Sequence, residues 1–315
     1  MKKAFSRHAS VWILIGFCLL LSVFLGLRTG SFFSLKNAVN ILESTSYRMI
    51  LAVGMTFIVA SGAIDLSVGS ILSLSSIVTA MCLHANIPVA VSILIGLAIG
   101  ALLGALNGVL VYTTRINSLI ITPATSFLYR GLSLILTRGT PVTRLPDGFR
   151  SFGYGDLFGM ESGVTMALVI LLLAFPLLYR MRWGHYITAL GGNPEALERT
   201  GVPVRRYRIG SFAAMGALAA LAGIIITARL NAAEPNAGLD MEMNAITAVI
   251  MGGTPLSGGC AELFGTAIAV FLLGLIRNGL TLMSVSSYYQ QFITGALLLI
   301  AVVAAEIHER KQRTA

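Results

Sequence analysis

The chain has 315 residues, of which 56% are hydrophobic and 11% are charged, and its mean hydropathy is +0.84. A soluble globular domain carries about 25% charged residues, so this composition excludes an ordinary soluble protein. The net charge of +9 comes from basic residues that are separated along the chain, without the interleaved aromatic residues of a nucleic-acid-binding stripe. We therefore expect an integral membrane protein that contacts membrane lipid and binds no nucleic acid.

Charge-free windows predict about ten transmembrane helices in one domain (1–315), an all-α polytopic bundle with short or broken helices. Between Asp65 and Arg115, for example, 49 consecutive residues carry no charge, and one crossing takes roughly 20 apolar residues. The first apolar run lacks a small-x-small cleavage site and is expected to be a retained helix. In chain order the expected helices are 11–27, 47–62, 68–84, 88–113, 118–137, 163–180, 209–228, 243–257, 263–283 and 287–305.

The distribution of basic residues predicts the topology. The two termini and the loop around 181–208 contain 12 of the 22 Lys and Arg residues. With the N-terminus inside, ten crossings place all three segments in the cytoplasm, as the positive-inside rule requires. The loops at 138–163 and 229–242 are neutral or net acidic and then lie outside.

Two glycine-rich windows resemble each other at an offset of 190 residues, either as an internal repeat or by chance. Each follows an apolar segment of about 15 residues, and paired short, Gly-interrupted helices are typical of broken helices beside a translocation path. The matching residues are Gly62, Leu66, Ser67 and Gly69 in the first window and Gly252, Leu256, Ser257 and Gly259 in the second. The candidate path residues are Gly62, Asp65, Ser67, Gly69, Gly252, Gly253, Thr254, Ser257 and Gly258.

Three charged residues lie in or beside the apolar segments. Asp65 either caps a helix that begins at Leu66, which we favour, or contacts a solute. Arg130 either pairs with a buried acid or packs at a helix interface. Arg277, near the outer end of its helix, is expected to extend its charge toward the membrane surface.

A short capped helix is predicted in the basic loop 181–208. Asn193 suits the N-cap and Pro194 the first helical position, while Glu195 favours the positive end of the helix. An isolated helix this short is marginal in water, so it must pack against the protein itself or against a partner. The segment comprises Asn193, Pro194, Glu195, Ala196, Leu197, Glu198, Arg199, Thr200 and Gly201, the last suited to a left-handed closing position.

Several sequence blocks, in order and spacing over nearly the whole chain, resemble the ribose/xylose/arabinose permease family of ABC importers. These blocks are AVGMT at 52–56, GAIDLSVGS at 62–70, RG at 130–131, GGN at 191–193, AITAVIMGGT at 245–254, LSGG at 256–259 and SYYQ at 287–290. Glu195, Ala196 and Gly201 are similar to the EAA-type coupling loop by which such permeases dock onto their ATPases. The departures from the family pattern, Asn117, Pro123 and Cys260-Ala261-Glu262, affect the expected specificity and gating and not the fold.

The resemblance implies a non-catalytic permease of the bacterial inner membrane, with both termini cytoplasmic, that forms the path for a monosaccharide of the ribose, xylose, arabinose or galactose class. It also implies a second permease copy or paralogue, a cytoplasmic ABC ATPase and a periplasmic solute-binding protein. The sequence has no G-x-x-x-x-G-K-[ST] motif, so ATP and Mg are expected on the ATPase and no cofactor or metal in this chain.

Three alternatives remain at this point. The solute could be a sugar-like signal molecule of the autoinducer-2 type. A secondary transporter would normally show paired intramembrane acids or ion-coordinating broken helices, and Asp65 alone supports it poorly. A membrane enzyme has little support, because the sequence contains no H-E-x-x-H or G-x-S-x-G motif.

Overall fold

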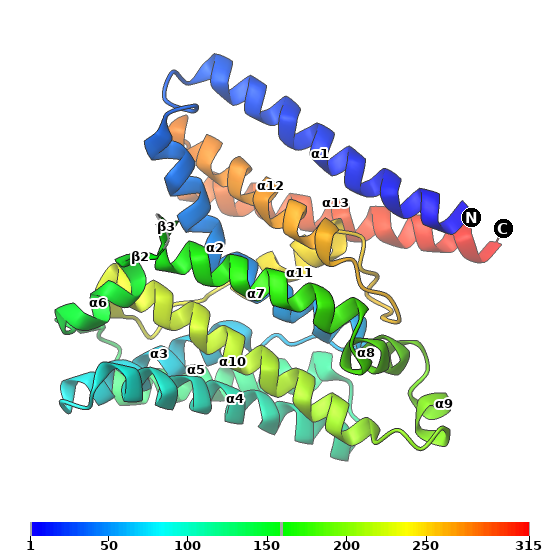
Figure 1. The fold of residues 1–315 in the computed structure, drawn as a ribbon, viewed down its shortest axis with the longest axis horizontal. Helices are drawn as coiled ribbons and strands as arrows, with labels where there is room; N and C mark the ends of the chain where they lie inside the picture. The colour runs from blue at the N-terminus through cyan, green and yellow to red at the C-terminus, as the bar shows by residue number, and fades with distance from the viewer. Residues whose placement is uncertain (1, 158–159, 315) are drawn as a thin grey trace.

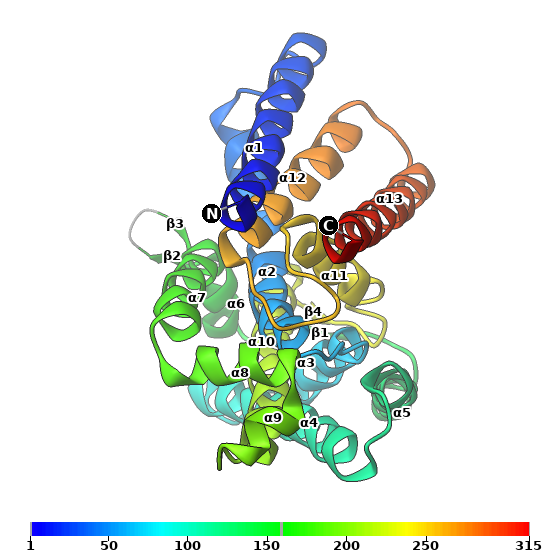
Figure 2. The same ribbon diagram turned by 90° about the vertical axis from the view of Figure 1, so that its right-hand side faces the viewer.

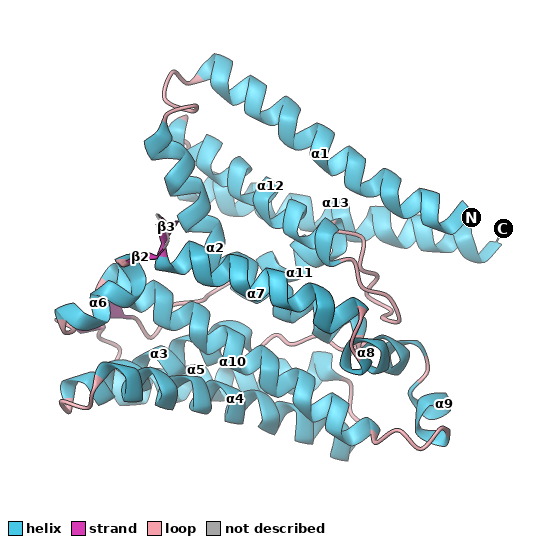
Figure 3. Cartoon of the chain, in the orientation of Figure 1, coloured by secondary structure: helices cyan, strands magenta, loops and turns pink. Residues whose placement is uncertain are grey.

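The computed structural model describes residues 2–157 and 160–314, and most of them are helical (Figure 3). Two-residue strands form two small antiparallel ladders, β1 (Val142–Thr143) with β4 (Ala232–Ala233) and β2 (Asp156–Leu157) with β3 (Met160–Glu161). The helices are α1 (Lys2–Arg28), α2 (Leu35–Ala60), α3 (Val68–His84), α4 (Val89–Thr114), α5 (Ser118–Thr137), α6 (Asp147–Tyr154), α7 (Ser162–Tyr179), α8 (Arg182–Gly192), α9 (Pro194–Arg199), α10 (Val204–Leu230), α11 (Met241–Met251), α12 (Leu263–Leu282) and α13 (Ser287–Thr314).

Each expected transmembrane range overlaps one of these helices, but five boundaries differ by five residues or more: the starts of α1, α2 and α10 and the ends of α11 and α13. Helix α2 begins at Leu35, twelve residues before the expected start, and α11 ends at Met251 and not at residue 257. In the described part of the chain, six helices are long and apolar enough to cross a membrane, while α3 and α11 are shorter. The helical membrane bundle is therefore observed, whereas the count of ten crossings is not confirmed.

Helix α2 runs through the centre of the bundle (Figure 2). Its residues 50–60 are all buried, and it packs against α7, α10, α11 and α12. Side chains that point outward from α1, α4, α5 and α7 include many exposed large apolar residues, for example Trp12, Leu94, Phe127 and Leu172. This surface has the composition that a hydrocarbon environment favours.

Glycines allow α4 and α10 to approach closely. A Cβ atom on Gly104 would collide with the carbonyl oxygen of Phe212, and one on Gly216 would collide with that of Gly100. Small residues at a helix interface let two backbones pack directly, which is how helices associate in lipid. The α4–α10 pair is thereby fixed as one side of the bundle.

The two ends of the bundle carry different elements. The N- and C-termini, α8 and α9 lie at one end, here called the α9 end, whereas α6 and the β2–β3 ladder lie at the other, here called the α6 end (Figures 1 and 2). Residues 138–157 and 181–203 therefore lie at opposite ends, as the charge distribution predicts.

Candidate functional site

Helix α9 projects from the bundle as a short, capped turn. The Asn193 side chain accepts a hydrogen bond from the backbone N–H of Ala196 (2.9 Å), and Pro194 occupies the first turn. Leu197 is the buried residue of α9 and packs with Leu190 and Val204, while the other residues of the segment are exposed. One apolar anchor thus holds the helix to α8 and α10, and its charged face, with Glu195, remains open at the α9 end.

Three chain segments meet in a glycine junction just before α9. The junction consists of Gly62 after α2, Gly191 at the end of α8, and Gly258 and Gly259 in the α11–α12 connection. A Cβ on Gly191 would collide with the Ala60 carbonyl oxygen and lie 2.6 Å from the Gly259 nitrogen. The Gly259 N–H donates to the Ala60 carbonyl (3.0 Å). Gly191 of α8 therefore contacts both the segment that precedes α3 and the segment that follows α11.

The helices α3 and α11 are each preceded by a non-helical segment. Residues 61–67 enter from the α9 end, where Gly62 touches Gly191 and the Arg208 guanidinium donates to the Ser61 carbonyl (2.9 Å). Residues 231–240 enter from the α6 end, after α10. The second segment touches the first turn of α3, where a Cβ on Gly69 would collide with the Gly238 carbonyl oxygen. Two interrupted helices that enter from opposite ends and meet inside are the arrangement expected along a translocation path.

Asp65 lies fully buried in the first of these segments. One of its carboxylate oxygens accepts hydrogen bonds from the backbone N–H (2.9 Å) and the hydroxyl (2.6 Å) of Ser67. The Ser67 hydroxyl in turn accepts from the Asn107 amide (2.7 Å), and the Tyr129 hydroxyl donates to the Asn107 carbonyl oxygen (2.9 Å). Asp65 therefore orders the turn before α3, which begins at Val68 and not at Leu66.

Backbone groups of both segments are satisfied by side chains of neighbouring helices. Ser118 and Thr122 of α5 accept from the N–H groups of Ile64 and Leu66 (both 2.9 Å). Arg130, also on α5, donates to the carbonyl oxygens of Pro235 (2.6 Å) and Ala237 (2.7 Å). Arg130 thus interacts chiefly with backbone carbonyls.

The second glycine window lies in the α11–α12 connection at the α9 end. Gly253 has φ +99°, and the Thr254 hydroxyl accepts from the Glu262 N–H (2.9 Å), which fixes the turn before α12. Gly252 packs against the backbone of Thr266, Ser257 is exposed, and Gly258 belongs to the glycine junction. The two windows thus meet at the junction, through Gly62 and Gly258.

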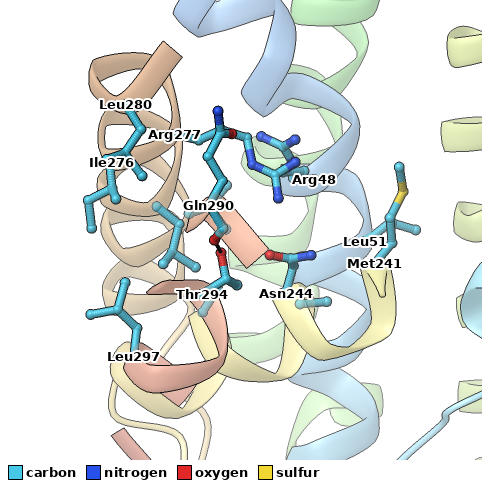
Figure 4. Close-up of a pocket in the computed structure, with 14 residues that line it drawn as sticks. Arg48, Leu51, Met241, Asn244, Ile276, Arg277, Leu280, Gln290, Thr294 and Leu297 are labelled. Atoms are coloured by element: carbon cyan, nitrogen blue, oxygen red, sulfur yellow. Dashed lines mark hydrogen bonds between the residues drawn. The ribbon is translucent and has the colours of Figure 1, made fainter. Parts of the chain in front are cut away.

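A pocket between α2, α11, α12 and α13 was missed by sequence reasoning (Figure 4). Its polar lining comes from one or two residues per helix: Arg48, Asn244, Arg277, Gln290 and Thr294. None of the nine path residues expected from sequence is among its lining residues. Arg48 lies within the expected helix 47–62 and Arg277 within the expected helix 263–283, and an arginine inside each of two apolar helices is the signal that could have located the pocket.

A family model described as "Branched-chain amino acid transport system / permease component" matches residues 37–302. The chain belongs to this permease family. Most of the bundle, from α2 into α13, lies within the matched range. No solved structure matches the chain.

Curated relatives of this permease are named as sugar permeases. The ribose import permease protein RbsC of Escherichia coli (strain K12) is 40% identical over 277 residues, 87% of this chain and 86% of the relative. RbsC of Bacillus subtilis (strain 168) is 41% identical over 287 residues, 90% of this chain and 89% of the relative. The L-arabinose ABC transporter permease protein AraH of Azospirillum brasilense is 32% identical over 314 residues, 98% of this chain and 92% of the relative. The resemblance stated from the sequence blocks is thereby confirmed.

Proposed function

We propose that this chain is the membrane permease subunit of a bacterial ABC importer and forms the translocation path for a monosaccharide. The names of its relatives, ribose and arabinose permeases at 32–41% identity over most of the chain, carry this assignment. The interrupted helices that meet at Gly69 and Gly238 supply the internal path, because non-helical backbone inside a membrane bundle is tolerated where it is buried in protein or lines a cavity.

In this proposal α9 is the coupling helix that docks into a separate ATPase, which binds ATP and Mg. Its exposed face offers Glu195, Glu198 and Arg199 to a partner, while Leu197 anchors it. The α9 end, with both termini, then faces the cytoplasm, and the α6 end faces a periplasmic solute-binding protein. A second permease copy or a paralogue completes the channel.

Movement of α9 would reach the path through the glycine junction. Gly191 touches Gly62 on the segment before α3 and Gly259 on the segment after α11. ATP-driven displacement of the coupling helix would thus act on both connections together, and the solute would gain access from alternate sides.

Affinity purification of the tagged permease in mild detergent from its native host tests the assignment. We expect an ABC ATPase to co-purify, and we expect Glu195→Arg, or a bulky residue at Gly201, to reduce the recovered ATPase at least about tenfold while membrane insertion is unchanged. Gly201 has φ +81° and no neighbour within 4 Å of a Cβ, so a change there alters the end of α9 without disturbing the core.

Asp147→Arg is the matched control, because Asp147 is an exposed acid at the α6 end. It should leave the ATPase bound. Equal ATPase recovery and normal solute uptake for both α9 variants would overturn the role of α9, and consistent absence of any ATPase would overturn the importer assignment.

A further inference from the structure

The half-buried arginines of the bundle fall into two groups. In the described part of the chain they are Arg48, Arg130, Arg208, Arg229 and Arg277. Three have polar partners: Arg130 donates to carbonyls of the 231–240 segment, Arg208 to Ser61, and Arg229 pairs with Glu43 and Glu161. Arg48 and Arg277 have no carboxylate partner among the described residues, and both line the pocket of Figure 4.

The two guanidinium groups that have no carboxylate partner among the described residues lie close together. Figure 4 shows the Arg48 and Arg277 side chains pointing toward each other at one end of the pocket. The positive charge of Arg277 repels that of Arg48, and Arg48 also interacts with the side chain of its neighbour Tyr47, through a hydrogen bond and with its guanidinium carbon 5.2 Å from the ring centroid. Two like charges that are partly removed from water repel each other strongly, and an anion between them would relieve that repulsion.

The remainder of the pocket suits a polyol. Asn244, Gln290 and Thr294 supply amide and hydroxyl groups, and Leu51, Met241 and Leu273 supply apolar surface. No acid lines the pocket in the described residues, and the carboxylate of Asp240 accepts from Gln291 (3.2 Å). The enclosed space is about 20 Å³, room for one water molecule, so a sugar enters only when the surrounding helices separate.

We propose that this pocket is a subsite of the translocation path for a monosaccharide that carries an anionic group, a carboxylate or a phosphate, held between Arg48 and Arg277. The inference rests on the proposed function and narrows its substrate class. Guanidinium groups match carboxylate and phosphate oxygens in geometry and form charge-assisted hydrogen bonds with them. A neutral sugar would leave both positive charges without a counter-charge.

Ligand-induced thermal stabilisation of the purified permease–ATPase complex tests this. D-galacturonate and D-ribose 5-phosphate are the anionic probes, D-galactose and D-ribose the neutral ones, and acetate and inorganic phosphate the bare anions. We expect at least one anionic sugar to bind at least about tenfold more tightly than its neutral counterpart, since hydrogen bonds to charged groups exceed neutral ones by this order. Which of the two binds better identifies the carboxylate or the phosphate.

Arg48→Gln and Arg277→Gln should each remove this preference, and Arg48→Lys should retain part of it. Arg180→Gln, at an exposed arginine, is the control and should change nothing. Equal binding of galacturonate and galactose, with no preference for ribose 5-phosphate over ribose, would overturn the proposal even if the variants failed to fold. A preference that survives both Gln variants, or bare anions that bind as tightly as the anionic sugars, would also overturn it.

The importer assignment and the anionic subsite can be refuted independently of each other. ATPase co-purification does not depend on Arg48 or Arg277, so both Gln variants should retain the ATPase. An importer whose ATPase co-purifies but whose pocket prefers neutral sugars would refute the anionic subsite alone.

Discussion

Three ionisable side chains, Glu43, Glu161 and Arg229, form a cluster that joins α2, β3 and α10. The Arg229 guanidinium lies 2.7 Å from a carboxylate oxygen of Glu43 and 3.0 Å from one of Glu161. One arginine cannot neutralise two ionised carboxylates. Burial raises the pKa of Glu161 to about 7, and the neighbouring Glu43 acts in the same direction, while Arg229 opposes the shift.

This shift predicts a pH-dependent stability. The folded protein holds a proton on Glu161 that the unfolded chain, with an ordinary pKa of 4.5, releases, so the free energy of unfolding falls as the pH rises from about 4.5 to about 7. Glu161→Gln removes this titration and should reduce the change in melting temperature between about pH 5 and pH 8. The measurement is thermal denaturation of the detergent-solubilised permease across that range.

Glu234→Gln provides the comparison, because Glu234 is exposed directly after β4 and forms no ion pair among the described residues. Its pH profile should match that of the unmodified protein. An unchanged profile for Glu161→Gln would show that Glu161 is ionised throughout this range.

At the scale of elements, the sequence predicted the ends of a helix correctly where neighbouring residues determine them. The ranges expected for α3 and α5 coincide with the observed bounds, and the Asn193 cap of α9 forms the hydrogen bond that its position suggests. The start of α2 was misplaced because Asn37 and Glu43 are unfavourable in lipid when considered alone. The structure pairs them with Asn278 and Arg229, residues about 190 to 240 positions away, and hydropathy cannot detect such partners.

The same limit explains the missed pocket. Its polar residues come from four helices, so no spacing in the sequence connects them. Arg277 was expected to extend toward the membrane surface, but the structure directs it into the pocket beside Arg48. The sequence indicated part of the glycine junction, because the windows at 62–69 and 252–259 resemble each other. The junction also includes Gly191, which belongs to neither window.

The junction predicts that Gly191→Ala impairs the permease. The added Cβ would collide with the Ala60 carbonyl, and backbone atoms cannot move aside as a flexible side chain can. We expect a loss of about 1–3 kcal/mol of stability, the usual cost of overpacking, and reduced ATP-driven uptake. Thermal denaturation and uptake into cells measure the two effects.

The adjacent Gly192→Ala is a closely matched control. The nearest atom to its Cβ would be Gly259 Cα at 3.9 Å, an ordinary contact. This variant should fold and transport normally. If both alanine variants behaved alike, contact between α8 and the two connections would not matter for transport.

At the scale of the whole molecule, the basic residues are unevenly distributed along the long axis of the bundle. Both termini and α9 lie at one end and α6 lies at the other, and the basic residues concentrate at the α9 end. Basic segments are retained in the cytoplasm during membrane insertion. The distribution of charge and the arrangement of the chain therefore support one orientation, with α9 available to an ATPase.

Labelling with a membrane-impermeant maleimide in intact cells tests this orientation. In a background where Cys18, Cys82 and Cys260 are replaced by serine, Asp147→Cys should be labelled from outside and Glu195→Cys only after the membrane is opened. Both positions are exposed, so a difference in labelling reports the side of the membrane and not burial. Labelling of both from outside, or of Glu195→Cys alone, would invert or reject the orientation. The ATPase could then not reach α9, because it acts where ATP is present, in the cytoplasm.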